Sequence, residues 1–169
     1  MKLVLGLGGN VGDVAEAFHM VSQTLVLRLD TVPRARSRLY RTAPVGPEQP
    51  RYLNAALLVE TALPPREFLG VCLEIEGRAG RKREAEVPWG PRTLDLDLLL
   101  IENLVCRGPV LDVPHPFLAE RAFALLPAAE VAPDWVHPLS GRTLDELAKK
   151  ALQENPSAVE WAEPWPDER

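Results

Sequence analysis

Two acidic residues, Asp95 and Asp97, form the clearest chemical feature of the sequence, because they alternate with leucines in a run from residue 93 to 101. In a β-strand, neighbouring side chains face opposite ways, so the two carboxylates would share one face. The other face would be a packed core of leucines: Leu94, Leu96, Leu98 and Leu100. Paired carboxylates repel each other unless a cation or an arginine lies between them, and their hard oxygens suit magnesium. The pattern therefore indicates a magnesium site, although alternation alone fits a solvated strand face equally well.

Basic side chains are concentrated just before this run. Within residues 78–92 the sequence holds Arg78, Arg81, Lys82, Arg83 and Arg92. Guanidinium groups match phosphate oxygens in pairs, and carboxylates for a metal beside arginines for phosphate are what polyphosphate transfer requires. The alternative is a solvated loop that pairs with its own glutamates. The sequence has no GxxxxGK[ST] motif, so a P-loop is excluded.

Four further residues are weaker candidates for a binding site. His115 lies between two prolines, and Asn54 is an amide among apolar residues that needs a hydrogen-bonding partner if it is buried. Tyr52 and Phe123 offer ring faces for stacking on a flat heterocycle. Each also has a structural interpretation, because single histidines and aromatic residues more often serve packing.

Six elements in a fixed order must position these residues. Hydrophobic periodicity predicts strands at residues 2–8, 34–42, 53–61 and 93–101, and helices at residues 13–29 and 64–79. Prolines make residues 43–51 a loop, and a polar loop covers residues 81–92. This β-α-β-β-α-β order predicts an α+β, ferredoxin-like fold in which two helices cover one face of an antiparallel sheet and leave the other face free.

The remaining residues predict additions to this core. We expect a short hairpin at residues 105–113 and helices at residues 120–126 and 143–152. Residues 1–154 would form a single catalytic domain. Residues 155–169 would form an irregular C-terminal tail, packed in part through Trp161 or Trp165.

Composition narrows the class of protein. The net charge of −5 over 169 residues gives no global positive field, so we expect no nucleic acid and no membrane as partner. The two cysteines, Cys72 and Cys106, have no CxxC neighbour, which favours a reducing, cytoplasmic location. No stretch has the length of a membrane span. We expect a monomer.

Five motifs occur in an order that resembles the 6-hydroxymethyl-7,8-dihydropterin pyrophosphokinase family. They are Leu7–Asp13, Tyr40–Gly46, Gln49–Ala56, Trp89–Asp97 and Pro114–His115. The resemblance covers about residues 3 to 135, and WGPRTLDLD is its most specific part. It implies a ferredoxin-like enzyme of folate biosynthesis that transfers diphosphate from ATP to the pterin alcohol and releases AMP.

The resemblance also implies a role for individual residues. Asp95 and Asp97 would hold two magnesium ions on the ATP phosphates and, with Arg81 and Arg92, form the catalytic group. The ATP-binding residues would be Glu76, Arg81, Arg83, Trp89, Arg92, His115 and Arg121. The pterin-binding residues would be Thr42, Pro44, Val45, Tyr52, Asn54, Asp95 and Phe123. The sequence departs from the family at Gly9, where serine is usual, at Ala43, where proline is common, and at Pro116.

Two other classes fit part of the pattern. Ferredoxin-like sheets also bind RNA through exposed aromatic residues, but here that face would carry two acids. A metal-dependent phosphohydrolase would share the carboxylates, but it would release phosphate from ATP without a pterin. The products formed from ATP and the pterin separate all three classes.

Overall fold

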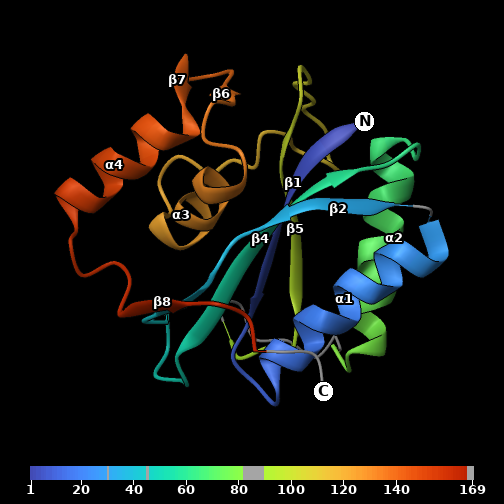
Figure 1. Ribbon diagram of the computed structural model, residues 1–169, viewed down its shortest axis with the longest axis horizontal. Coiled ribbons are helices and arrows are strands. Elements are labelled where there is room, and N and C mark those ends of the chain that lie inside the picture. The colour runs from blue at the N-terminus through green and yellow to red at the C-terminus, as the bar shows by residue number, and fades with distance from the viewer. Residues whose placement is uncertain (30, 45, 82–89, 167–169) are drawn as a thin grey trace.

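The computed structural model describes residues 1–29, 31–44, 46–81 and 90–166, which form an antiparallel sheet with helices on both faces (Figure 1). The strands are β1 (Lys2–Gly9), β2 (Val32–Arg36), β3 (Leu39–Thr42), β4 (Tyr52–Glu60), β5 (Asp95–Ile101) and β8 (Trp161–Glu163), with a separate hairpin of β6 (Val136–His137) and β7 (Arg142–Thr143). The helices are α1 (Val14–Leu29), α2 (Pro65–Arg78), α3 (Ala122–Val131) and α4 (Leu144–Glu154).

The main sheet has the strand order β5-β1-β4-β3-β8, and β2 also pairs with β4. All of these pairings are antiparallel. Strands β2 and β3 are one extended segment interrupted at Ser37, whose Oγ accepts a hydrogen bond from the Ala56 N–H at 2.9 Å. The predicted α+β, ferredoxin-like βαββαβ core is confirmed.

Local sequence signals set the ends of the first two helices. The Asp13 carboxylate accepts a hydrogen bond from the Glu16 N–H at 3.1 Å, which satisfies an end group of α1. At the end of α2, Gly80 has a φ of 87°, a conformation that glycine adopts without strain. Both helices bury the predicted apolar face against one side of the sheet, through fully buried residues such as Phe18 and Phe68.

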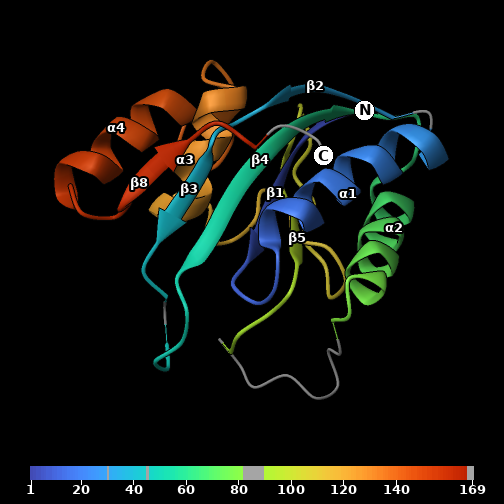
Figure 2. The ribbon, with the colours of Figure 1, turned by 60° about the horizontal axis from the view of Figure 1, so that its bottom comes forward.

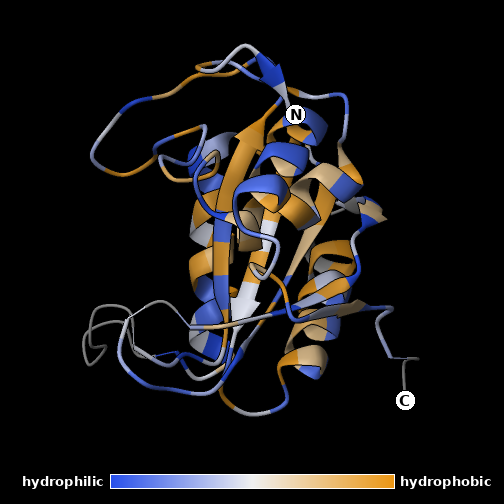
Figure 3. Ribbon diagram, turned by 90° about the vertical axis from the view of Figure 1, so that its left-hand side faces the viewer, coloured by the Kyte–Doolittle hydropathy of each residue, from blue (hydrophilic) through white to orange (hydrophobic). Residues whose placement is uncertain are grey.

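The other side of the sheet is also covered, which corrects the expectation of a free face. Helix α3 lies against β4 and β1, and α4 packs on α3 (Figure 2). Their buried side chains, including Leu125 and Leu144, form a second core with Val4 and Leu99. In Figure 3 much of the length of the central strands is orange, with white and blue segments between, as expected for a sheet with two covered faces.

A β-bulge in β5 changes the predicted alternation. Leu98 lies opposite Leu5, but Leu100 lies opposite Val4, so Leu99 is an additional residue in the ladder. Leu94, Leu96 and Leu98 face the core under α1 and α2 as predicted. Leu100 was assigned to that face wrongly, because the bulge turns it with Leu99 into the second core.

The C-terminal segment is partly regular. Residues 161–163 form β8 on the edge of β3, and Trp165 is buried, with its Nε1 donating to the Ser37 carbonyl at 2.7 Å. Among residues 155–166 the tail is therefore irregular only outside β8, and its packing through tryptophan is confirmed. The hairpin expected at residues 105–113 is a single bridge between Cys106 and Val113. Among the described residues, no helix combines the length and apolar character needed to cross a membrane.

Candidate active site

A cavity of about 100 Å³ lies on the side of the sheet that carries α3, and it collects most of the predicted site. Its wall includes both carboxylates, two of the predicted arginines and four of the predicted pterin-binding residues: Asp95, Asp97, Arg92, Arg121, Thr42, Tyr52, Asn54 and Phe123. Gly6 and Gly8 of β1 contribute backbone to the wall. Pro44, Glu76, Arg81 and His115 are not among the residues that line it.

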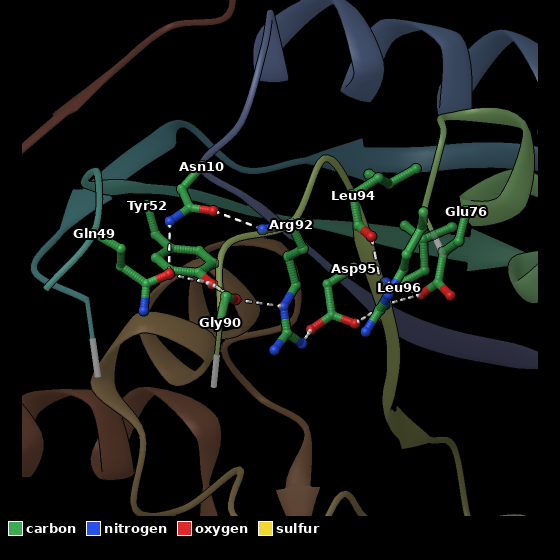
Figure 4. Close-up of polar contacts among 10 residues, drawn as sticks. Asn10, Gln49, Tyr52, Glu76, Gly90, Arg92, Leu94, Asp95 and Leu96 are labelled. Atoms are coloured by element: carbon green, nitrogen blue, oxygen red, sulfur yellow. Dashed lines mark hydrogen bonds and ion pairs between the residues drawn. The ribbon is translucent and has the colours of Figure 1, made fainter. Parts of the chain in front are cut away.

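Asp95 lies between two arginines: Arg81, which follows α2, and Arg92, which precedes β5. Its Oδ1 pairs with the Arg81 guanidinium, and its Oδ2 accepts a hydrogen bond from Arg92 Nη1 at 2.8 Å (Figure 4). The Arg81 side chain is only 4% exposed, so acidic partners must offset the hydration that its charge has lost. The contacts place Arg81 and Arg92 beside one carboxylate.

Glu76 of α2 is the second acidic partner of Arg81. Its carboxylate is buried and accepts hydrogen bonds from Arg81 Nη1 and from the Leu96 N–H, each at 2.8 Å. These contacts join the last turn of α2 to β5. In this structure Glu76 therefore fixes Arg81 behind the cavity, and its predicted contact with ATP stays a prediction.

Asp97 has a different environment from Asp95. Burial raises the pKa of the Asp97 carboxyl to about 7, and the nearby acids Asp95 and Glu76 add to the effect. Arg81 and Arg121 lower the pKa but do not cancel the rise. A carboxylate with such neighbours is stabilised by an added cation. Asp95 and Asp97 thus form a short negative strip within a wall that also carries two arginines.

The opposite part of the cavity carries the residues predicted for the pterin. Asn54 Nδ2 donates to Thr42 Oγ1 at 2.9 Å, so the amide of this buried residue is held by the neighbouring strand. The Tyr52 hydroxyl donates to the Gly90 carbonyl at 2.9 Å. Phe123, in the first turn of α3, supplies a ring to the same cavity. An amide, a hydroxyl and an aromatic ring surround a space suited to a flat polar heterocycle.

Arg121 and His115 lie at the entry to α3. Arg121 occupies the N-cap position of the helix and lines the cavity, and burial lowers the pKa of its guanidinium. The His115 N–H donates to the Leu99 carbonyl at 2.8 Å, and its ring Nδ1 accepts from the Phe117 N–H at 3.2 Å. Burial, followed by the charge of Arg121, lowers the pKa of His115. Three predicted residues, Val45, Arg83 and Trp89, lie outside the described part of the chain.

Asn10 is a site residue to which the sequence analysis gave no role. Its Oδ1 accepts from the Arg92 N–H at 2.8 Å, and its Nδ2 donates to Gln49 Oε1 and to the Pro50 carbonyl, each at 3.0 Å (Figure 4). One amide thus connects Gln49 and Pro50 to Arg92, just before β5. The signal in the sequence was an asparagine directly after a buried strand, but its partners are 39 to 82 residues away.

Neighbouring Gly9 explains one departure from the family pattern. A Cβ atom at this position would lie 2.7 Å from the Thr93 carbonyl oxygen and 3.0 Å from a Val14 methyl group. Backbone atoms cannot move aside as a flexible side chain can. The close approach of β1 to the residues before β5 therefore favours glycine here.

Comparisons with known proteins agree with this geometry. Residues 4–133 match the family model of 7,8-dihydro-6-hydroxymethylpterin-pyrophosphokinase (HPPK). The chain is 42% identical over 163 residues to the 2-amino-4-hydroxy-6-hydroxymethyldihydropteridine pyrophosphokinase of Methylorubrum extorquens, covering 96% of this chain and 99% of the relative. It is 40% identical over 147 residues to the protein of the same name from Synechocystis, covering 87% of this chain and 74% of the relative.

The fold also matches a solved structure. The wild-type Plasmodium falciparum HPPK-DHPS protein superposes on 92% of this chain with a TM-score of 0.63 and 15% sequence identity. The chain spans 42% of that longer protein. Such low identity supports the fold alone, while the sequence matches carry the assignment: the chain belongs to the 7,8-dihydro-6-hydroxymethylpterin-pyrophosphokinase family.

Proposed function

We propose that the chain transfers a diphosphate group from ATP to the hydroxymethyl oxygen of 6-hydroxymethyl-7,8-dihydropterin and releases AMP, a step of folate biosynthesis. Family membership supports this reaction. The observation that carries it to this chain is one cavity that combines a carboxylate pair, two arginines and a polar aromatic pocket. We also propose that residues 1–154 form one catalytic domain, and that the chain acts as a monomer in the cytoplasm.

The carboxylate pair fits magnesium. Asp95 and Asp97 present oxygen ligands from the same side of β5, and the pKa of Asp97 is raised first by burial and then by the neighbouring acids Asp95 and Glu76, so an added cation would stabilise its charged form. The described residues hold no cluster of three or more metal-binding side chains, so a cation here would depend on substrate oxygens and water for its other ligands. That is the usual arrangement for magnesium in enzymes that act on nucleotides. Two ions at this pair would neutralise the triphosphate when bound.

The residues of the chain divide the work of positioning. Thr42, Tyr52, Asn54 and Phe123 hold the pterin with its hydroxymethyl group toward the carboxylates. Arg92 and Arg121 bind phosphate oxygens, and Arg81 keeps Asp95 in place from behind. The hydroxymethyl oxygen of the pterin attacks the β-phosphorus, and its proton passes to the Asp97 carboxylate or to water. The bond from that phosphorus to the α,β-bridging oxygen breaks at the same time, so AMP leaves in line. Fixed positioning and charge complementarity therefore supply most of the catalysis.

Removing either carboxylate tests this assignment. We expect Asp95→Ala and Asp97→Ala to lower the rate of AMP formation from ATP and the pterin by at least about 100-fold, because each loses an oxygen ligand for the magnesium that would neutralise the transferring phosphates. AMP, ADP and phosphate would be separated by chromatography, with circular dichroism as the check on folding.

Asp134→Ala is the matched control, since this acid is exposed and does not line the cavity. Near-normal turnover in either active-site variant would refute the roles of the carboxylates. Release of phosphate by the wild-type protein without pterin would instead favour a phosphohydrolase.

A further inference from the structure

An aromatic pair surrounds the guanidinium of Arg121. Its central carbon lies 4.3 Å from the centroid of the Phe117 ring and 5.8 Å from that of the Phe123 ring. The N–H donors of a guanidinium lie in its plane, so stacking on its faces does not itself use these donors. The two rings can therefore restrict Arg121 without competing with an anion in the cavity.

The stacking has a physical purpose at this position. The Arg121 side chain is partly buried, so its guanidinium has lost part of its hydration, and this burial lowers its pKa. An arginine side chain also has many rotamers, and this rotamer entropy is lost when the side chain is fixed. An aromatic face attracts the cation and reduces the number of rotamers that Arg121 adopts before any ligand binds.

Phe117 also contacts His115, which precedes it in the chain, whereas Arg121 follows it. Its backbone N–H donates to His115 Nδ1 at 3.2 Å, and the two ring centroids lie 6.1 Å apart. When Nδ1 accepts a hydrogen bond, the neutral imidazole carries its proton on Nε2, so that nitrogen becomes a donor. The lowered pKa of His115 favours this neutral form.

Packing in the core does not explain the Phe117 side chain, because it is 44% exposed. It belongs to neither hydrophobic core, unlike its neighbour Leu118, which is fully buried in the second one. The chain thus places an aromatic ring at the surface, where its described ring contacts are Arg121 and His115.

We propose that Phe117 is a positioning residue that prepares Arg121, and with it His115, to receive the phosphates of ATP. The proposal rests on the proposed function for the identity of the ligand. It assigns Phe117 no contact with the reacting atoms. Its effect passes through Arg121, so it should appear in ATP kinetics and should vanish when Arg121 is removed.

Three substitutions separate the effect of aromatic stacking from the effect of side-chain volume. Phe117→Ala removes the ring, Phe117→Leu keeps an apolar side chain without a π face, and Phe117→Tyr keeps the ring. We expect the first two to lower kcat/KM for ATP by about 3- to 10-fold, and Phe117→Tyr to stay within about twofold of the wild-type protein. KM for the pterin should not change in any of them. Leu139→Ala is the control for loss of an exposed apolar side chain, because Leu139 is 58% exposed and does not line the cavity.

A double-mutant cycle supplies the decisive measurement. In an Arg121→Ala background, we expect Phe117→Ala to lower kcat/KM for ATP by less than about twofold. The reason is that the group positioned by Phe117 is already gone. An equal loss with and without Arg121, or full activity in Phe117→Leu, would overturn the proposal.

Binding of the magnesium complex of α,β-methylene-ATP, followed by calorimetry, keeps this result separate from the proposed reaction. If the wild-type protein binds the analogue but forms no AMP from ATP and the pterin, the proposed function fails. Weaker binding of the analogue by Phe117→Ala would still support the positioning role. If the wild-type protein does not bind the analogue, or if Phe117→Ala binds it as tightly as the wild-type protein, the role of Phe117 is refuted.

Discussion

Charges of alternating sign run from α2 to the cavity, through Glu76, Arg81, Asp95 and Arg92 in that order. Each of these four side chains contacts at least one opposite charge, which allows Arg81 to be buried. Within the described residues, Asp97 has no ion pair of this kind. The two carboxylates of the strand therefore differ: arginines neutralise Asp95, while burial disfavours the charged form of Asp97, which a substrate-bound cation would stabilise.

The burial of Asp97 leads to a prediction about stability. Because the folded state raises the pKa of Asp97 to about 7, the folded protein binds a proton there more tightly than the unfolded chain, whose pKa is near 3.8. Stability from this group is therefore full below about pH 4 and is lost as pH rises toward 7. Asp97→Asn should remove that loss.

In buffer with EDTA, we expect the Tm of Asp97→Asn to exceed that of the wild-type protein at pH 7.5, by about 2–4 °C for each kcal/mol gained. At pH 4 the two values should converge. Scanning calorimetry at both pH values measures the difference. A Tm gap that is equal at both pH values would contradict the assigned cause.

The sequence alone could predict the roles of residues whose partners are close in the chain. It could also predict residues whose spacing by itself places them on one face of an element. The i, i+2 spacing of Asp95 and Asp97 was enough to place both on one face, and the structure puts both on the cavity wall. Asn10 and Phe117 were missed for different reasons. Asn10 acts through partners far away in the chain, and the ring of Phe117 gains a role only because the turn before α3 brings Arg121 against it.

At the scale of elements, periodicity predicted the strands and helices of the core but not the bulge at Leu99. A leucine run looks the same with or without an additional residue in the ladder, so alternation alone could not show where Leu100 turns. The bulge has a packing reason. The Leu99 side chain lies over Gly6, where a Cβ atom would approach it to 2.9 Å, so glycine on β1 makes room for the additional leucine.

Glycines in two elements should respond in opposite ways to alanine. At Gly9 the new Cβ atom would meet the Thr93 carbonyl at 2.7 Å, so we expect Gly9→Ala to lower the free energy of unfolding by about 1–3 kcal/mol. Gly70 lies exposed inside α2 with no atom within 4 Å of the new Cβ, so Gly70→Ala should raise it by about 0.5–1 kcal/mol. Urea unfolding measures both, and a shift of the same sign in the two variants would contradict the steric argument.

At the scale of the whole molecule, one sheet separates two hydrophobic cores. Adjacent residues of β1 alternate between them: Leu3 and Leu5 face α1 and α2, while Val4 faces α3 and α4. The free face predicted from the βαββαβ order was wrong because that order describes only residues up to 101. The later helices were predicted as additions, but their docking surface depends on Val4, Ala56 and Leu99, which read as ordinary strand residues.

A shared sheet should make the two cores unfold together. Phe18→Ala in the first core and Leu125→Ala in the second both remove fully buried side chains, and each should lower the free energy of unfolding by about 2–5 kcal/mol. Because every central strand contributes to both cores, neither core can lose its packing while the sheet stays intact. We therefore expect one transition in each variant, with the same midpoint by far-UV circular dichroism and by tryptophan fluorescence. Trp135 packs on the second core and Trp165 lies in the first, so fluorescence senses both. Separate midpoints in either variant would mean that α3 and α4 form an independent unit, and that residues 1–154 are not one cooperative domain.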